Sequence, residues 1–419
     1  MKFSGGKGIS QKMTVGLVVV VIILIAAGAG AYYYIQDGDG DTDEWEDYPD
    51  PNAVDLDEET PTIGGVFLGL SNPWGELNRD AFEWYVGDVL GWDYEVVWPD
   101  DVEDQNDGAE MLIDQGVDAL VVDPIDREAN AKIGQVAKEA GIPVVLFGND
   151  MQHSWPLAMF QRNDRLSGEA CGEYLAQALE EKKGEVSGKI LIIHGRRGTN
   201  SQSLRAGGFF DAIDEYRENL EFVEVGNSWS ATAELPEVRS ALQANPDIDA
   251  VYEMMGGFHT TFKEAAEELG WSEEEIKDVI NVNVDCFPVN VDAFEEGTQD
   301  YARMMPTGGY MMAPSLELLR EYWKAESREE VEEVLPEIGT TYSIDKYAPE
   351  MQVNAEANGF QPLQWFEDEE YGVSPTDIRP APAAGEDTPW VLIRDRIVDE
   401  TNYEEDFIYW NWPVWGLSD

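Results

Sequence analysis

One pattern dominates the middle of this chain: short apolar runs alternate with longer amphipathic stretches from Ile63 onward. The runs consist mostly of Val, Ile and Leu, as in IGGVFLGL (63–70), YEVVW (94–98), ALVVDP (119–124) and IPVVLFG (142–148). Such runs suit parallel strands that are covered on both faces, and the stretches between them carry apolar residues at helical three- and four-residue spacing. The alternation therefore predicts a doubly wound α/β sheet.

The same pattern starts a second time after residue 163. Its apolar runs are KILIIHG (189–195), LEFVEVG (220–226), AVYEMM (250–255) and VINVNVD (279–285). A chain of 419 residues also exceeds the roughly 250–300 residues at which a single core stops growing. We therefore expect two Rossmann-like lobes, each a parallel sheet flanked by helices, with ligand-binding loops at the carboxyl ends of the strands.

The charge of the chain is extreme. The sequence has 85 Asp and Glu residues against 27 Lys and Arg residues, which gives a formal net charge of −58. Such a chain repels polyphosphates and anionic lipid surfaces, so nucleic acid is excluded as a partner. Because salt screens self-repulsion, this balance is typical of surfaces adapted to high ionic strength, as in halophilic archaea; the alternative is an acidic secreted protein.

The N-terminal region predicts a membrane anchor. Residues 14–34, TVGLVVVVIILIAAGAGAYYY, are uncharged and mostly apolar, and a helix of about 20 such residues crosses a bilayer core of about 30 Å. The lysines in residues 1–13 place this leader, retained or cleaved, on the cytoplasmic side, and KGIS (7–10) resembles an archaeal pilin-like processing site. Residues 35–61 are acidic and predict a disordered linker. We therefore expect the lobes outside the cell, tethered to the membrane.

Six motifs, taken in order, carry a resemblance to a known family. They are NPW (72–74), VDPIDREA (122–129), GIPVVLFGND (141–150), GRRGTNSQSLRAGGF (195–209), ANPDIDAVY (244–252) and VNVDCFPVNVDAFEEG (282–297). Together they resemble the ribose-binding type of solute-binding protein that serves bacterial and archaeal ABC importers. The resemblance implies two α/β lobes, joined by a three-stranded hinge, that close on a ligand without performing chemistry.

The resemblance also implies a division of the chain. Lobe 1 is expected over 62–163 plus about 305–385, and lobe 2 over 164–304 plus about 386–400. An aromatic C-terminal extension follows at 401–419. The crossings between the lobes are expected near Asn163, near Met304 and before Trp390.

The NPW loop places a tryptophan between a buried strand and a helix. In the family the aromatic residue after Asn-Pro covers the ligand, which implies this role for Trp74, with Asn72 donating to a hydroxyl group. Trp229 falls at the family's second aromatic position, and Asp285 falls at the carboxylate that accepts from sugar hydroxyls. Aromatic faces pack on the C–H patches of a sugar ring while polar groups satisfy its hydroxyls. The alternatives are that both tryptophans anchor their loops and that Asp285 caps a turn.

Other positions depart from the family pattern. The family's Asp-Arg pair aligns with Gly148 and Asn149, its loop arginine falls on Ser203, and two of its amides fall near methionines. A pocket of this kind is less polar than a pentose site, so a nucleoside or another partly apolar metabolite stays an alternative to a sugar. The remaining candidates for ligand contact are Asp123, Asn149, Asp150, Ser203, Arg205, Met255 and Met304. For Asp123, Asn149 and Asp150 the alternative is a role in a turn or a hinge, and for Arg205 it is a surface ion pair.

The sequence predicts no cofactor and no metal. His153, His194 and His259 lack partners at metal-ligand spacing, and GRRGTNS lacks the ending of a phosphate loop. No nucleophile, base and orienting group stand in a recognisable arrangement, so we do not expect an enzyme. Cys171 and Cys286 either pair in a disulfide or remain as thiols.

These observations predict a membrane-tethered solute-binding protein that captures a small polar molecule, with a sugar as the leading ligand. Its partners would be that ligand and the permease of an ABC importer. The alternative is a ligand-sensing ectodomain that serves a signalling receptor.

Overall fold

The computed structural model describes residues 49–70, 73–152, 154–304, 309–336, 341–342, 376–381, 385–393 and 396–403. The predicted anchor at 14–34, Asn72 and most of the aromatic extension at 401–419 lie outside these ranges. Within these ranges, none of the helices combines the length and the apolar character that a bilayer crossing needs.

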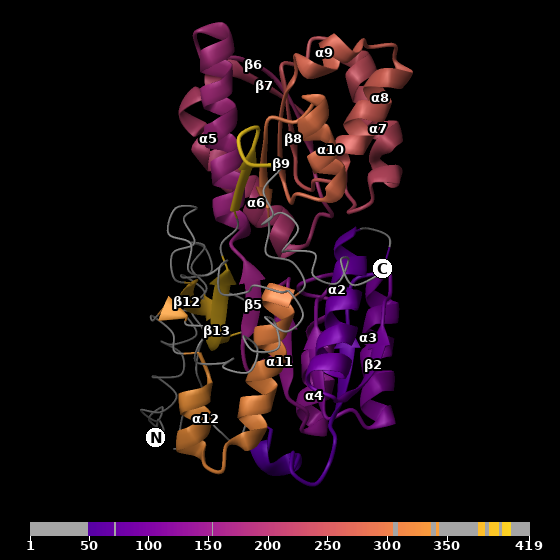
Figure 1. Cartoon of the computed structure of the whole chain (residues 1–419), viewed down its shortest axis with the longest axis vertical. Coiled ribbons are helices and arrows are strands. Elements are labelled where there is room, and N and C mark those ends of the chain that lie inside the picture. Colours follow the sequence, from indigo (N-terminus) through magenta and orange to yellow (C-terminus); the bar gives the residue numbers. More distant parts are fainter. Residues whose placement is uncertain are drawn as a thin grey trace, which may run out of the picture. The chain divides into compact units, whose positions relative to one another are not determined.

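Two largely parallel sheets organise the chain, as the alternating pattern predicts (Figure 1). In the first sheet the order is β11-β12-β13-β5-β4-β3-β1-β2. Strands β1 to β5 and β13 run parallel, while β12 is antiparallel to both β13 and β11. The bounds are β1 Thr62–Val66, β2 Asp93–Val97, β3 Ala119–Val122, β4 Val144–Phe147, β5 Met159–Arg162, β11 Thr341–Tyr342, β12 Thr376–Ala381 and β13 Gly385–Ile393.

The second sheet has the order β14-β10-β9-β8-β6-β7. All neighbours run parallel except β14, which is antiparallel to β10. The bounds are β6 Gly188–Ile193, β7 Leu220–Val225, β8 Ala250–Glu253, β9 Ile280–Val284, β10 Tyr301–Met304 and β14 Arg396–Asp399.

Helices fill the connections between the strands. With the first sheet lie η2 Pro51–Ala53, α2 Pro73–Glu83, the π-helical turn η3 Trp84–Val89, α3 Val102–Gln115, α4 Ala131–Ala140, α11 Gly309–Lys324 and α12 Arg328–Val334. With the second lie α5 Asp164–Lys183, α6 Asn200–Ala212, η4 Asp214–Asn219, α7 Ala231–Ala244, α8 Phe258–Glu268, α9 Glu273–Lys277 and α10 Pro288–Glu296.

Strand β6 shows why the apolar runs are nearly continuous. Ile190 and Ile192 pack into a core with α5 and α6, whereas Leu191 and Ile193 pack into a second core with α7 and α8. Successive side chains of a strand point to opposite faces, so a sheet covered on both faces needs apolar residues at every position. Figure 1 shows α5 on one side of this sheet and α7 and α8 on the other.

The chain crosses between the sheets at three places. It leaves the first sheet after β5, at Asn163, and returns to it after β10, which ends at Met304. The third crossing lies between Ile393 and Arg396, and so after Trp390 and not before it. The reason is that Trp390–Ile393 pair with Met159–Arg162 of β5, which keeps 386–393 in the first sheet. The other predicted lobe boundaries remain predictions.

Two helix starts that face the site are fixed by side-chain caps. The Asn163 side chain accepts from the backbone N–H of Leu166 at the start of α5, at 3.3 Å. Thr199 Oγ1 accepts from the backbone N–H of Gln202 at the start of α6, also at 3.3 Å. Each cap satisfies a backbone N–H that has no partner within its helix, and so fixes where the helix begins.

Candidate functional site

A cavity of about 340 Å³, partly open to solvent, lies where the strand ends of the two lobes meet. We call it the inner cavity; it is lined by Leu68, Trp74, Asn149, Arg162, Ser201, Arg205, Trp229, Met255 and Asp285. Every one of these residues ends a strand or follows one, after β1, β4, β5, β6, β7, β8 or β9. The inner cavity thus occupies the edge at which parallel α/β sheets bind ligands.

The wall from the first lobe is built around Trp74, in the first turn of α2. Its ring is stacked on Phe147, with centroids 5.9 Å apart and an interplanar angle of 15°. The guanidinium carbon of Arg162 lies 4.2 Å from the Trp74 ring centroid, a cation–π contact. Trp74 Nε1 donates to Asp123 Oδ2 at 3.2 Å, so the indole is held at its edge as well as over its ring.

Asp123 lies behind Trp74 and is fully buried. Burial raises the pKa of its carboxyl to about 6, although hydrogen bonds from Trp74 and Asn149 oppose the shift. Gly148 has φ +77, and a Cβ on it would come within 2.8 Å of the Asp123 carboxylate. Glycine suits position 148 because a side chain there would meet the Asp123 carboxylate and because few other residues adopt this backbone conformation.

Asn149 connects the two lobes. Its Nδ2 donates to Asp123 Oδ1 at 2.8 Å within the first lobe. Its Oδ1 accepts from Ser201 Oγ, on α6 of the second lobe, at 3.0 Å. Arg162 Nη2 also donates to Ser201 Oγ at 2.8 Å, so one hydroxyl joins two groups of the first sheet to α6.

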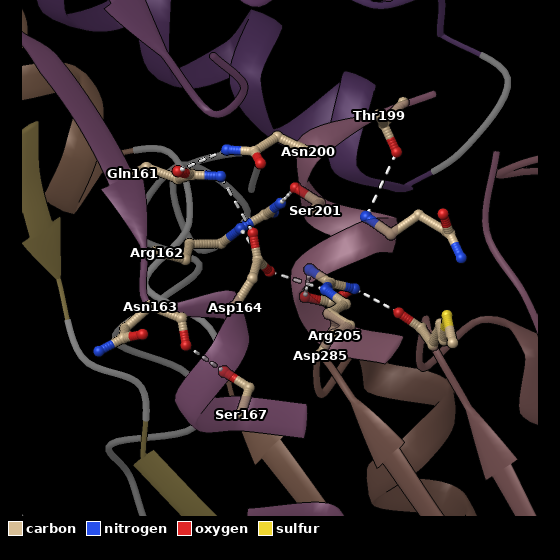
Figure 2. A network of polar contacts seen from close by, with 12 residues as sticks. Gln161, Arg162, Asn163, Asp164, Ser167, Thr199, Asn200, Ser201, Arg205 and Asp285 are labelled. Carbon is tan, nitrogen blue, oxygen red and sulfur yellow. Dashed lines mark hydrogen bonds and ion pairs between the residues drawn. The ribbon is translucent and has the colours of Figure 1, made fainter. Parts of the chain in front are cut away.

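A buried ionic network centred on Arg205 forms the floor of the inner cavity (Figure 2). Arg205 Nε donates to Asp164 Oδ1 at 2.7 Å, Nη1 donates to Asp285 Oδ2 at 3.1 Å, and Nη2 donates to Asp285 Oδ1 at 3.4 Å. The Met254 carbonyl also accepts from Nη1. Arg205 is 2% exposed, so this is a buried ion pair and not the surface pair considered as the alternative.

The network also sets the charge state of Asp164. Desolvation alone raises the pKa of this buried carboxyl, but the charges of Arg162 and Arg205 lower it more, so the net pKa lies below the ordinary value. The Arg205 pKa is raised because Asp285 and Asp164 outweigh its own desolvation. Asp164 and Arg205 are therefore both ionised near neutral pH.

Asp285 follows β9 in a left-handed backbone conformation, with φ +75. Few residues other than glycine adopt this conformation, although Asp and Asn do so more readily than most. Its backbone N–H donates to the Arg303 carbonyl at 2.8 Å, which holds the turn against β10. In Figure 2 the Asp285 carboxylate lies beside the Arg205 guanidinium, and Asp285 also lines the inner cavity.

Trp229 and Met255 form the less polar wall from the second lobe. The half-buried Trp229 ring packs against both cores of that lobe, and the Arg205 guanidinium carbon lies 5.5 Å from its centroid. A Cβ on Gly195 would come within 2.0 Å of the Trp229 ring, so the ring rests directly on the Gly195 backbone. Met255 is buried in the loop that follows β8.

Six predicted residues line the inner cavity: Trp74, Asn149, Arg205, Trp229, Met255 and Asp285. Asp123 supports the wall from behind. Asp150 is buried away from the lining, with its carboxylate 3.6 Å from Arg127, and Ser203 Oγ donates to the Thr199 carbonyl of its own helix at 3.2 Å. Asn72 and the side chain of Met304 lie outside what the structure describes.

The sequence analysis missed Leu68, Arg162 and Ser201. Helical phase is the signal that would have found Ser201. Since α6 begins at Asn200, Ser201 and Arg205 are four residues apart on one helix face, and Ser203 points elsewhere. Arg162 is the last residue of β5 and stands next to the predicted crossing at Asn163.

The cysteines are buried and are not joined to each other. The Cys171 thiol donates to the Asn283 carbonyl at 3.3 Å, and burial raises the pKa of the Cys286 thiol. Where the structure describes the chain, no group of His, Cys, Asp and Glu is arranged to hold a metal ion.

Two α/β lobes whose strand ends converge on one cavity define the periplasmic-binding-protein class. Residues 63–327 match the family model of the periplasmic binding protein domain, and the chain belongs to this family.

Known proteins of similar sequence include the ribose import binding protein of Salmonella typhimurium, 25% identical over 197 residues. That match covers 46% of this chain and 62% of the relative. The D-apiose import binding protein of Paraburkholderia graminis is 28% identical over 166 residues, covering 39% and 51% respectively. The chain thus spans less than two thirds of the length of these relatives.

Solved structures share the fold. A solute binding protein of an ABC transporter from Bacillus halodurans, with bound myo-inositol, has a TM-score of 0.62 at 19% identity, over 84% of this chain and 98% of that chain. A galactofuranose binding protein has a TM-score of 0.59 at 19% identity, over 66% of this chain and 90% of that chain.

Proposed function

We propose that this protein is an extracytoplasmic solute-binding protein that captures a sugar in the inner cavity and delivers it to the permease of an ABC importer. The residue 14–34 segment would tether it to the membrane. The observation that carries the proposal is that aromatic and polar side chains from both lobes converge on one cavity at the strand ends.

The chemistry of the lining suits a neutral polyhydroxylated ring. Trp229 offers an apolar ring face for the C–H patches of a sugar, and Trp74, whose ring is stacked on Phe147 and covered by Arg162, adds apolar surface at the wall. Asn149, Ser201 and Asp285 offer donors and acceptors for hydroxyls. The guanidinium groups of Arg162 and Arg205 are balanced by Asp164 and Asp285, so the lining carries no excess positive charge for an anion. A neutral ligand fits better than an acidic sugar.

Closure of the lobes would couple binding to delivery. Ser201 joins Asn149 and Arg162 across the lobes, and such contacts exist only when the lobes meet. A ligand that touches both walls stabilises that arrangement over an open one, and this differential affinity is what drives a hinge motion. A permease that recognises the closed form would then accept loaded protein only.

The test is a binding screen with the full chain in detergent and molar KCl. Thermal shift over neutral sugars, sugar acids and nucleosides, followed by calorimetry, should yield a neutral sugar as the tightest ligand. Trp74→Ala and Asp285→Asn should each weaken that ligand by at least about tenfold. Trp155→Ala removes an exposed tryptophan outside the cavity and serves as the control. Well-folded protein that binds no sugar would refute the proposal.

A further inference from the structure

A second cavity adjoins the first and belongs to no site described above. This outer cavity has about 630 Å³ of space, partly open to solvent. It shares Leu68 and Trp229 with the inner cavity, so the two are neighbours along one cleft. Among the described residues, those that line it are Leu68, Gly69, Pro99, Asp100, Ile125, Arg196, Ser228, Trp229 and Ser230.

The outer cavity is formed by both lobes. Gly69, Pro99, Asp100 and Ile125 come from loops that follow β1, β2 and β3 of the first sheet, and the rest of the polar lining comes from the second lobe. The Arg196 guanidinium donates to the Asp100 backbone carbonyl, with Nη2 at 3.3 Å, and so spans the cleft. The carbonyl is engaged by Arg196, whereas the Asp100 carboxylate has no ion-pair partner among the described residues.

The chemistry of the lining is that of a ring-binding site. Leu68, Pro99 and Ile125 supply apolar surface, and the Trp229 side chain faces both cavities. The hydroxyls of Ser228 and Ser230 and the guanidinium of Arg196 lie beside that surface. Ser228 Oγ already bonds to the Ser230 backbone, Ser230 Oγ accepts from the Ala233 N–H and Arg196 donates to the Asp100 carbonyl, and each group keeps further hydrogen-bonding capacity. The two linings share only Leu68 and Trp229, so a single sugar ring in the inner cavity leaves the other groups of the outer lining unused.

We propose that the ligand is a glycoside with two rings: a sugar in the inner cavity and a second ring in the outer cavity, joined past Leu68 and Trp229. This inference rests on the proposed function and narrows its ligand class. The second ring is a further sugar or a nucleobase, since both present a flat or partly apolar face with polar edges. Arg196 and Ser228 hold its polar edge, and Trp229 contacts both rings.

Matched probe pairs test the inference by calorimetry on the full chain in detergent and molar KCl. The pairs are D-glucose with cellobiose, D-galactose with lactose, and D-ribose with adenosine. In at least one pair the two-ring probe should bind at least about tenfold more tightly than its single sugar. The disaccharide pairs and the nucleoside pair separate the two sources of the second ring.

Variants of the outer lining give the second readout. Ser228→Trp fills the space and should weaken the two-ring probe by about tenfold while leaving its single sugar within about twofold. Arg196→Ala removes a donor of the outer lining and also a contact between the lobes, so it should weaken the two-ring probe several-fold more than its single sugar. Arg197→Ala is the matched control, because its side chain does not line the cavity. Melting temperatures show that each variant is folded.

The outcomes separate this inference from the proposed function. If single sugars bind and their two-ring partners bind no more tightly, the outer cavity is only an entrance and the inference is wrong. The inference is also wrong if Ser228→Trp and Arg196→Ala leave the two-ring affinity unchanged. If neither single sugars nor two-ring probes bind, the proposed function fails as well.

Discussion

Replacing Arg205 by methionine tests whether the ionic network holds the second lobe together. The change removes the cation from two buried carboxylates: Asp285 keeps no other cation among the described residues, whereas Asp164 keeps Arg162 at 3.6 Å. Breaking a buried pair from one side costs about 3–5 kcal/mol, because a desolvated charge is left uncompensated. We expect Arg205→Met to lower the free energy of unfolding by that amount.

The pH dependence of the loss distinguishes this cause from simple loss of packing. In the native protein the pKa of Asp164 is lower than in the unfolded chain. The ionised carboxylate therefore stabilises the folded state above the unfolded pKa of about 3.9, and this stabilisation is lost as the pH falls through the folded pKa. Arg205→Met removes one of the two cations that oppose the desolvation of Asp164, so the pKa of Asp164 is higher in the variant than in the native protein and the ionised carboxylate destabilises the variant less as the pH falls. The deficit of the variant should therefore shrink on acidification.

Urea unfolding in molar KCl, followed by tryptophan fluorescence between neutral pH and about pH 4.5, measures both effects. Arg239→Met is the matched control, because Arg239 Nη1 meets Glu268 Oε2 at 2.6 Å on an exposed helix face. An exposed pair contributes less than about 1 kcal/mol, so this control should unfold nearly as the native protein does. An Arg205→Met deficit below about 1 kcal/mol, or one that is the same at both pH values, would refute the reasoning.

Three further predictions concern other parts of the molecule. The Asp123 carboxyl should titrate near pH 6 by carbon NMR, and an ordinary carboxyl pKa would contradict the burial argument. Because its pKa is raised on folding, the protonated carboxyl contributes on the order of 3 kcal/mol to the free energy of unfolding, and this contribution should be lost as the pH rises from about 4 to about 6. Ser201→Ala should weaken sugar binding by about tenfold in calorimetry, because a hydroxyl that joins the lobes is lost. Ser203→Ala should leave affinity unchanged, and equal effects of the two would count against a role for Ser201. A net charge of −58 predicts a melting temperature that rises between about 0.1 M and about 2 M KCl, and a flat response would contradict it.

The sequence predicted the two sheets well, because a strand that is buried on both faces is encoded by a nearly continuous run of apolar residues. The run PWVLIRDRIV (389–398) was less informative, since it holds parts of two strands. In the structure β13 ends at Ile393 in the first sheet and β14 begins at Arg396 in the second. No glycine or proline marks the break between them, so periodicity alone had no means of placing the third crossing.

Site residues were predictable where a motif fixed a strand end, as at Trp74, Trp229 and Asp285. Arg162 is different, because it ends β5 and no motif singled out that strand in the sequence. Asp123 follows β3 at the expected edge of the sheet, but Trp74 lies between it and the inner cavity. The sequence pattern does not show which of two side chains at one strand end lines the cavity, because that depends on how they pack. That these residues contact a ligand remains a prediction.

The contact between Gly195 and Trp229 has an evolutionary consequence. The bare backbone at Gly195 sets the tilt of an aromatic side chain that borders both cavities. Even a single methyl group at that position would push the indole toward the opposite wall and narrow the cleft along its length. Related proteins could thus differ in ligand specificity through a residue at this position, which does not contact the ligand. A mutagenesis library restricted to lining residues would not include it.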